Sequence, residues 1–355
     1  MAKLFRSPKI ITGLIALVCI FLVGIAGGAL GNEFGGGFLG APLAHIQLPA
    51  ESISADPLVG SFNITNTMVA TWATVIFLAL ISYISTRRIQ EVPGRLQSLV
   101  ETILEFFLNL AENVAGQEKA RKFFPLTMTI FLFVVTANWM GILPLFGTVG
   151  WVEPAEQIIH HAEDKAEAEG VHLDLSSVHL QVFDKVGPLS VQPLGSVASD
   201  ITNAKEMEVV GLANGQKAGL LVPYLRSANT DINMTLGIAI IAMVMVHWWG
   251  LRILGVPKHI GKFINFKEGV IGLFVGVLEA VSEVARIIAF TFRLFGNIFA
   301  GEVLLIAMAF LLPLIGLVPF LGLELFVGLI QAFIFSMLTL VFAATATVSH
   351  GNGDH

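Results

Sequence analysis

Apolar runs of about twenty residues recur along the chain and restrict it to one class of structure. A run of this length crosses the hydrocarbon core of a bilayer as an α-helix, whereas a membrane β-strand shows a shorter, alternating pattern. Of all residues, 55% are hydrophobic and 13% charged, with a mean hydropathy of +0.80. Because backbone polar groups inside lipid must be paired internally, we expect an all-α integral membrane protein, a polytopic helical bundle.

Several other classes are excluded by the same composition. The formal net charge of −6 resides largely in one loop, and no basic cluster indicates nucleic acid. The single Cys19 lies inside an apolar run, so no disulfide can form within the chain. The spacing of His160, His161 and His172 fits no standard metal site, and we expect neither a metal nor another cofactor.

Basic residues beside the apolar runs predict the orientation of the chain in a cell membrane, because cytoplasmic loops are enriched in Lys and Arg. Residues 1–30 combine a basic start with apolar Ile10–Ala26, which is either a signal peptide or an additional anchor helix. Residues 31–66 form an outer loop. Six apolar segments, or five if the first is removed, both leave the C-terminus in the cytoplasm.

The remaining segments follow in order. Residues 67–146 hold two spans, Thr67–Ser85 and Pro125–Phe146, joined by a basic cytoplasmic loop. Leu96–Val114 in this loop has apolar residues at helical spacing and predicts an amphipathic helix on the membrane surface or against a partner. Residues 147–227 form an acidic outer insertion with a short helix, Gln157–Glu169, ended by Gly170.

Residues 228–348 contain a span, Asp231–Trp249, and then a charged helical hairpin, and residues 349–355 form a cytoplasmic tail. Asp231 stands at the mouth of its span, where it is either a helix N-cap or part of an access channel.

The hairpin begins with Leu278–Leu305, an apolar run that contains charges. A charge at membrane depth costs about 2.5–3.5 kcal/mol on insertion scales, so such residues indicate a functional site. At about 100° per residue, Glu279, Arg286 and Arg293 share one helix face, with Asn297 nearby. Glu302 points to the opposite face, so Arg293 and Glu302 cannot pair.

The second arm, Val318–Val348, carries Glu324 and Gln331 on one stripe. The run Leu312–Pro319 breaks the helix between the arms. In an antiparallel hairpin, Arg293 then lies level with Gln331, and Glu302 lies level with Glu324. Two carboxylates at one depth in low dielectric cannot both ionise cheaply, so we expect one of them to hold a proton.

Two stretches carry a family resemblance: Arg293–Glu302, with the sequence RLFGNIFAGE, and Gln331–Phe335, with the sequence QAFIF. They resemble subunit a of the bacterial F-type ATP synthases, as do Asn229–Thr235 and Asn138–Pro144. The resemblance extends from about Thr67 to Val348, apart from the long outer loop, which is longer than expected of this family. It implies a membrane stator with a long tilted C-terminal hairpin facing a partner ring and no catalytic residues, since the ATP chemistry is on other subunits.

The resemblance also implies residue roles and partners. Arg293 would face the carboxylates of the c-ring, and the partners would be c-ring proteolipids, peripheral-stalk b subunits and membrane lipid. The other residues it marks are Asn297 and Gln331 beside the arginine, Glu302 and Glu324 in the outer access path, Glu279 and Arg286 towards the cytoplasmic exit, and Asp231 and Asn138 as a possible access channel.

Alternatives remain at this stage. Arg286 and Glu283 can instead form a structural pair between helices. A stand-alone proton- or sodium-coupled transporter, or a membrane assembly protein without transport, would also carry charged apolar helices. Co-purification with a small two-helix proteolipid favours the stator, and solute uptake by this chain alone favours the transporter. The choice between proton and sodium is open, because the ring supplies the ion-binding carboxylate.

Overall fold

The computed structural model describes residues 8–27, 48–53, 63–87, 89–170, 179–184, 190–191, 196–203, 216–261, 263, 269–311 and 314–348. Most of the basic start, most of the outer loop 31–66 and the tail 349–355 lie outside these residues. The chain divides into two compact units. The first unit is Met1–Val69, Gly141–Arg226 and Ala300–Leu325, and the second unit is Ala70–Met140, Ser227–Phe299 and Phe326–His355.

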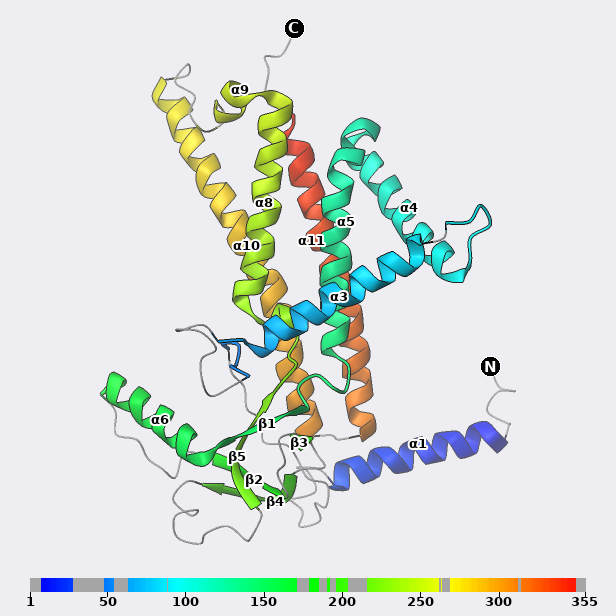
Figure 1. Ribbon diagram of the computed structural model, residues 1–355, viewed down its shortest axis with the longest axis vertical. Coiled ribbons are helices and arrows are strands. Elements are labelled where there is room, and N and C mark those ends of the chain that lie inside the picture. Colours follow the sequence, from blue (N-terminus) through cyan, green and yellow to red (C-terminus); the bar gives the residue numbers. More distant parts are fainter. Residues whose placement is uncertain are drawn as a thin grey trace. The chain divides into compact units, whose positions relative to one another are not determined.

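The second unit is a helix bundle, in which α5, α8, α11 and the first part of α10 run side by side (Figure 1). Helices α10 and α11 also contribute residues to the first unit. The helices with residues in this unit are α3 (Asn66–Thr86), α4 (Arg95–Ala115), α5 (Gln117–Gly141), η3 (Ala228–Thr230), α8 (Ile232–Leu254), α9 (Val256–Ile260), α10 (Gly269–Leu311) and α11 (Val318–Ala346).

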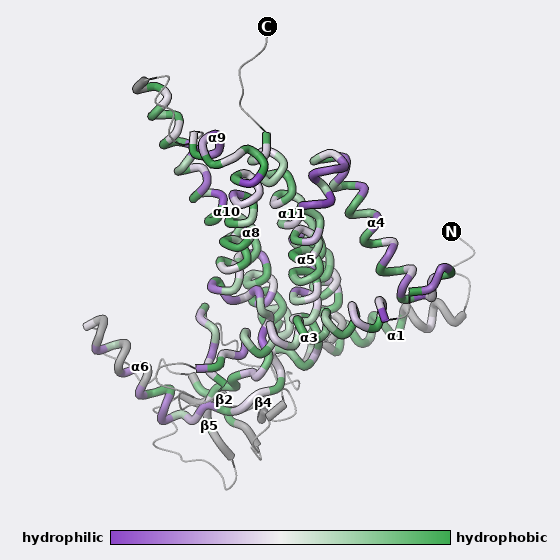
Figure 2. The backbone as a smooth tube through the Cα atoms, turned by 45° about the horizontal axis from the view of Figure 1, so that its top comes forward, coloured by the Kyte–Doolittle hydropathy of each residue, from purple (hydrophilic) through white to green (hydrophobic). Residues whose placement is uncertain are grey.

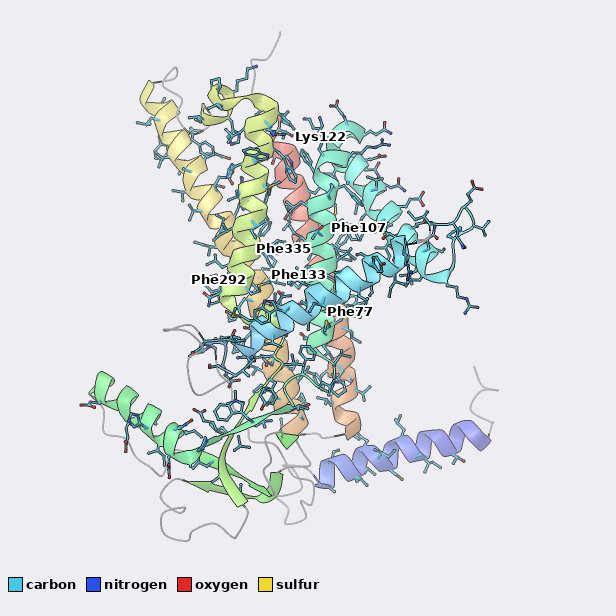
Figure 3. The ribbon with its side chains drawn as sticks, viewed as in Figure 1. Phe77, Phe107, Lys122, Phe133, Phe292 and Phe335 are labelled. Carbon is cyan, nitrogen blue, oxygen red and sulfur yellow. The ribbon has the colours of Figure 1, made fainter. Side chains whose placement is uncertain are left out.

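The core of the bundle joins five helices through aromatic and aliphatic side chains. Phe107 of α4 packs on Phe131 of α5 with 4.2 Å between ring centroids, and Phe290 of α10 packs on Phe335 of α11 at 4.7 Å. Figure 3 labels Phe107 and Phe335 in this core, together with Phe292, which is exposed on α10. Interdigitated rings of this kind fix which faces of α10 and α11 meet.

Four helices in the described part of the chain, α3, α5, α8 and α11, are long and apolar enough to cross a membrane. Their outward side chains are also apolar: Ile76 of α3 is 66% exposed, and Val244 of α8 is 59% exposed. Figure 2 colours much of these helices as hydrophobic. Exposed apolar surface on this scale suits lipid rather than water. The predicted class, an all-α multi-pass membrane protein, is confirmed.

The first unit contains a β-sheet that the sequence analysis did not predict. Its five strands are antiparallel and lie in the order β3-β1-β5-β2-β4. Helix α6 (Ala155–Glu169) follows β1 and ends at Gly170, whose φ of 67° is left-handed, as expected of a glycine C-cap. The strands are β1 (Val149–Pro154), β2 (His179–Asp184), β3 (Ser190–Val191), β4 (Ser196–Asn203) and β5 (Gln216–Pro223).

The backbones of β1 and β5 approach each other closely at two glycines. A Cβ at Gly219 would overlap the Glu153 carbonyl, and a Cβ at Gly150 would overlap the Val222 carbonyl. Glycine at both positions therefore permits the pairing. Also in the first unit, α1 (Pro8–Gly27) contacts η5 (Leu314–Leu317), the short turn between α10 and α11.

Candidate functional site

Arg226 is placed by the end of the sheet in the first unit. β5 ends at Pro223, after which the amide of Tyr224 donates to the Val149 carbonyl at 2.9 Å, and the amide of Gly147 donates to the Leu225 carbonyl at 2.9 Å. These bonds fix the backbone immediately before Arg226, whose residue surface is only 5% exposed. A guanidinium cannot lose its proton in a protein, so this burial requires anionic or carbonyl partners.

The partner of Arg226 is Glu302 on α10. Nε donates to Oε1 at 3.0 Å and to Oε2 at 3.1 Å, and Nη2 donates to Oε2 at 3.0 Å. Both carboxylate oxygens of Glu302 are therefore engaged by one guanidinium, in the fork geometry that gives the strongest ion pairs. The remaining arm, Nη1, donates to the Pro49 carbonyl at 3.2 Å.

Sequence reasoning missed the role of Arg226. One signal was available: the residue is an arginine on the side expected to face outward, where the positive-inside rule predicts few basic residues. Such an exception suggests a cation that is held by a specific partner.

Glu51 joins this cluster through a short antiparallel contact. The amide of Ile53 donates to the Ile64 carbonyl at 3.0 Å, and the amide of Asn66 donates to the Glu51 carbonyl at 3.0 Å. This pairing places the Asn66 side chain beside the Glu51 side chain, and Asn66 Nδ2 donates to Glu51 Oε2 at 3.0 Å. Asn66 Nδ2 also donates to the Pro223 carbonyl at 3.2 Å, which ties the contact to the end of β5.

The environment of Glu51 raises the pKa of its carboxyl group from 4.5 to about 7. Burial is the largest cause, because it penalises the charged form. Arg226 and the hydrogen bond from Asn66 lower the pKa, while the nearby carboxylates of Glu302 and Glu153 raise it. Glu51 was not among the site residues expected from the sequence, since nothing in the local pattern marks it.

Glu324, on α11, is a third carboxylate near Glu302. Its residue surface is 9% exposed, and its carboxylate lies against Gly301, next to Glu302 on α10. Glu302 and Glu324 are near enough to interact electrostatically. From the sequence we expected Glu302 and Glu324 at one depth, with one of them holding a proton. That expectation was incomplete, because Arg226 supplies a cation to Glu302 from a distant part of the chain.

The second unit holds another ionisable cluster, on the first part of α10. Arg286 hydrogen-bonds to Glu283 one turn earlier, and its Nη2 lies 3.7 Å from Glu279 Oε1. The pair of Arg286 and Glu283 is therefore formed within one helix, not between helices as the structural alternative assumed. His247 of α8 supplies the contact between helices: its Nε2 lies 3.5 Å from Glu283 Oε2, and its Nδ1 lies 3.3 Å from His259 Nε2.

Arg293 is exposed on α10, as is Asn297, whereas the adjacent Leu294 and Ile298 are buried in the core of the bundle. Within the described ranges, no acidic side chain lies in ion-pair distance of Arg293. Gln331 of α11 is buried.

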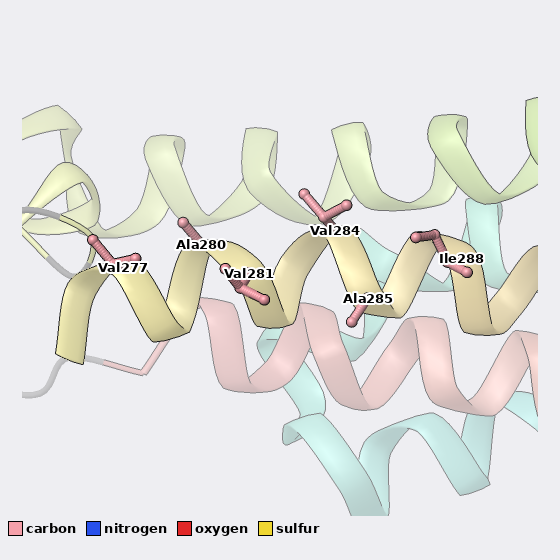
Figure 4. Close-up of a pocket in the computed structure, with 6 residues that line it drawn as sticks. All are labelled: Val277, Ala280, Val281, Val284, Ala285 and Ile288. Atoms are coloured by element: carbon pink, nitrogen blue, oxygen red, sulfur yellow. The ribbon is translucent and has the colours of Figure 1, made fainter. Parts of the chain in front are cut away.

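Towards its start, α10 presents an open apolar hollow. Figure 4 shows the side chains that line it: Val277, Ala280, Val281, Val284, Ala285 and Ile288. The exposed surface of α10 therefore combines these small or apolar side chains with the cation of Arg293.

Asn138 and Asp231 have structural partners. Asn138 is buried, and its Nδ2 donates to the Gly328 carbonyl at 3.0 Å, while its Oδ1 accepts from Asn229 Nδ2 at 2.7 Å. Asp231 is the N-cap of α8, because its side chain accepts from the Asn233 amide at 2.9 Å. A role of either residue in an access channel stays a prediction. Among the described residues, no group of His, Cys, Asp and Glu could hold a metal ion.

The fold and these clusters define a multi-pass helical membrane protein with ionisable side chains on otherwise apolar helices. The family model described as ATP synthase A chain matches residues 68–344, and the chain belongs to this family. The ATP synthase subunit a of Gloeobacter violaceus is 28% identical over 289 residues, which cover 81% of this chain and 85% of that protein. The subunits a of Helicobacter acinonychis and Helicobacter pylori are each 26% identical over 276 residues, covering 78% of this chain and 87% of theirs.

Family membership makes the chain a non-catalytic subunit of the membrane sector, Fo, of an ATP synthase. It acts in the proton-translocating sector, in complex with other Fo subunits, and the ATP chemistry takes place elsewhere in the complex.

Proposed function

We propose that this chain conducts protons to and from the carboxylates of a c-ring through two offset half-channels, and so couples ion flow to rotation. The observation that carries the proposal is Arg293, a cation exposed on an apolar helix with no acidic partner among the described residues. An intramembrane cation without an internal counter-charge is costly, so a partner that brings a carboxylate to it accounts for its position.

The chemistry follows from the cost of burying charge. A ring carboxylate surrounded by lipid is neutral, because the ionised form is too costly there. When rotation brings it beside Arg293, the fixed cation lowers its pKa and the proton leaves. Each elementary charge that crosses a potential of about 100 mV contributes about 2.3 kcal/mol, which is the free energy available for rotation.

The two half-channels use different clusters. The outer path includes Glu302 and Glu324, with Asp231 and Asn138 as further candidates, and the inner path passes Glu279 and Arg286. Asn297 and Gln331 act beside Arg293 as polar neighbours.

The small and apolar surface of α10 shown in Figure 4 suits close packing of a ring helix. The amphipathic helix α4, on which Leu99 and Phe106 are exposed, suits a peripheral-stalk b subunit or the lipid surface. In this arrangement Arg252 and Lys258, at the end of α8 and in α9, lie on the cytoplasmic side together with the C-terminus.

The test is coupled ATP synthesis by the assembled complex in membrane vesicles. We expect Arg293→Ala to abolish synthesis, and Arg293→Lys to lose most of it, because lysine keeps the charge but not the planar fork. Arg252→Ala is the matched control: it removes an exposed arginine that stacks on Trp248, and synthesis should remain. Normal synthesis by the Arg293→Ala complex would overturn the proposal.

A second measurement separates the stator from a stand-alone transporter. The chain should co-purify with a small two-helix proteolipid, and liposomes that contain this chain alone should show no coupled solute uptake. Uptake without the proteolipid would favour the transporter.

A further inference from the structure

The cluster around Arg226 contains more acid than base. Glu302 accepts from the fork of Arg226, and Glu302 and Glu153 both lie close enough to Glu51 to interact with it electrostatically. Arg226 is the cation that acts on Glu51. One guanidinium offsets one carboxylate, so a second carboxylate in the same partly buried place gains from binding a proton.

Glu51 is the member of the cluster that can take up this proton. Both oxygens of Glu302 accept from Arg226. The neutral amide of Asn66 donates a hydrogen bond to Glu51 Oε2. Binding a proton at Glu51 therefore leaves the Arg226–Glu302 ion pair intact, whereas binding one at Glu302 would break charge-assisted hydrogen bonds.

The side chain of Asn66 is a second, independent observation. Asn66 is fully buried, and its Oδ1 has no hydrogen-bond partner within the described residues. A buried amide oxygen without a donor is costly, and it is commonly satisfied by an ordered water. A water at this oxygen would lie on the residue that holds Glu51, where it could deliver a proton.

We propose that Glu51 is a proton-binding residue at the outer entrance of this chain, positioned by Asn66 and Arg226. The inference rests on the proposed function. Glu51 takes a proton from outer water and becomes a neutral carboxylic acid. It then releases that proton through water towards Glu324 and returns to the carboxylate.

Glu302 connects the two acids electrostatically. It interacts with Glu51 and also with Glu324, so a change of charge at Glu51 is felt along the cluster. The elevated pKa of Glu51, about 7, supports the same role. A group with a pKa near the ambient pH exchanges protons in both directions without a large free-energy step.

The test is passive proton flux through membranes that hold the complete Fo sector, at constant driving force, while the outer pH is stepped across neutrality. Wild type should show an inflection near pH 7. Glu51→Gln should lower the flux several-fold and lose the inflection, whereas Glu51→Asp should retain it because a carboxyl group remains. Glu156→Gln, an exposed glutamate on α6, is the matched control and should behave as wild type.

A measurement on the unmodified complex tests proton binding at Glu51 even if the variants fail to assemble. A carbodiimide reacts with protonated carboxyl groups, so labelling of Glu51, read by mass spectrometry, should fall as the pH rises through 7. Labelling that is absent or independent of pH would overturn the inference. So would wild-type flux in Glu51→Gln, or loss of the inflection in Glu51→Asp, which would indicate a purely structural role.

Failure of this inference is distinguishable from failure of the proposed function. If Arg293→Ala abolishes coupled synthesis and Glu51→Gln changes nothing, only the role of Glu51 is wrong. If Arg293→Ala retains synthesis, the proposed function itself fails.

Discussion

Breaking the Arg226–Glu302 ion pair tests whether this contact stabilises the folded first unit. Arg226→Met removes a buried cation and leaves the Glu302 and Glu51 carboxylates without it. Removing one partner of a buried ion pair costs about 3–5 kcal/mol. Because the Glu302 side chain is 26% exposed, water can partly resolvate it, and we expect the lower end of that range.

Glu302→Gln is milder, because an amide oxygen remains to accept from Arg226. Its cost should be about 1.5–3 kcal/mol, the usual contribution of hydrogen bonds to a charged group. Since both changes remove the same attraction between charges, the double variant should cost at least about 1 kcal/mol less than the sum of the single variants.

The assay is the free energy of unfolding of the purified chain in mixed micelles, for wild type, both single variants and the double variant. The control cycle is Lys122→Met with Glu118→Gln, an exposed pair at 2.9 Å one turn apart on α5 (Figure 3 labels Lys122). Its coupling should be much smaller, because both side chains are exposed and water screens their charges. Additive costs at Arg226 and Glu302, or a coupling no larger than in the control, would refute the reasoning.

Three further outcomes are expected. The folded protein holds a proton on Glu51 that the unfolded chain releases, so wild type should lose thermal stability as pH rises from about 4.5 through 7, and Glu51→Gln should flatten that slope. Gly301→Ala should displace the Glu324 carboxylate and slow proton flux, whereas Gly322→Ala, which meets no neighbour, should not. Asn138→Ala removes the acceptor of the buried Asn229 amide and a donor to the Gly328 carbonyl, and should lower the free energy of unfolding by about 1–3 kcal/mol, measured by the same micelle titration.

Some contacts within single helices could be anticipated from residue spacing. Arg286 lies near Glu279 and Glu283 on α10 because residues three, four and seven apart share a helix face. The alternative that placed the Arg286–Glu283 pair between helices ignored this spacing. The contact between Glu283 and His247 could not be predicted from spacing, since it depends on how α8 packs against α10.

The sheet of the first unit shows a different limit. Its strands pair residues far apart in the chain, as β1 does with β5, and few of them carry a long alternating pattern. In a polar, acidic insertion such strands resemble loop, because their stability comes from partners and not from local propensity. The helix α6 within the same insertion was predictable, since its spacing and its glycine C-cap are local signals.

By itself, the sequence determined that this protein is a multi-pass helical membrane subunit and which helices carry Arg293, Glu302 and Glu324. Lengths of apolar runs, helical period and the cost of charge in lipid are all properties of short segments. Only the tertiary structure decided that Arg226 binds Glu302, 76 residues away, and that Glu51 joins them through Asn66. A contact between distant segments has no period, so it exists only once the chain has folded and burial makes each charge require a partner.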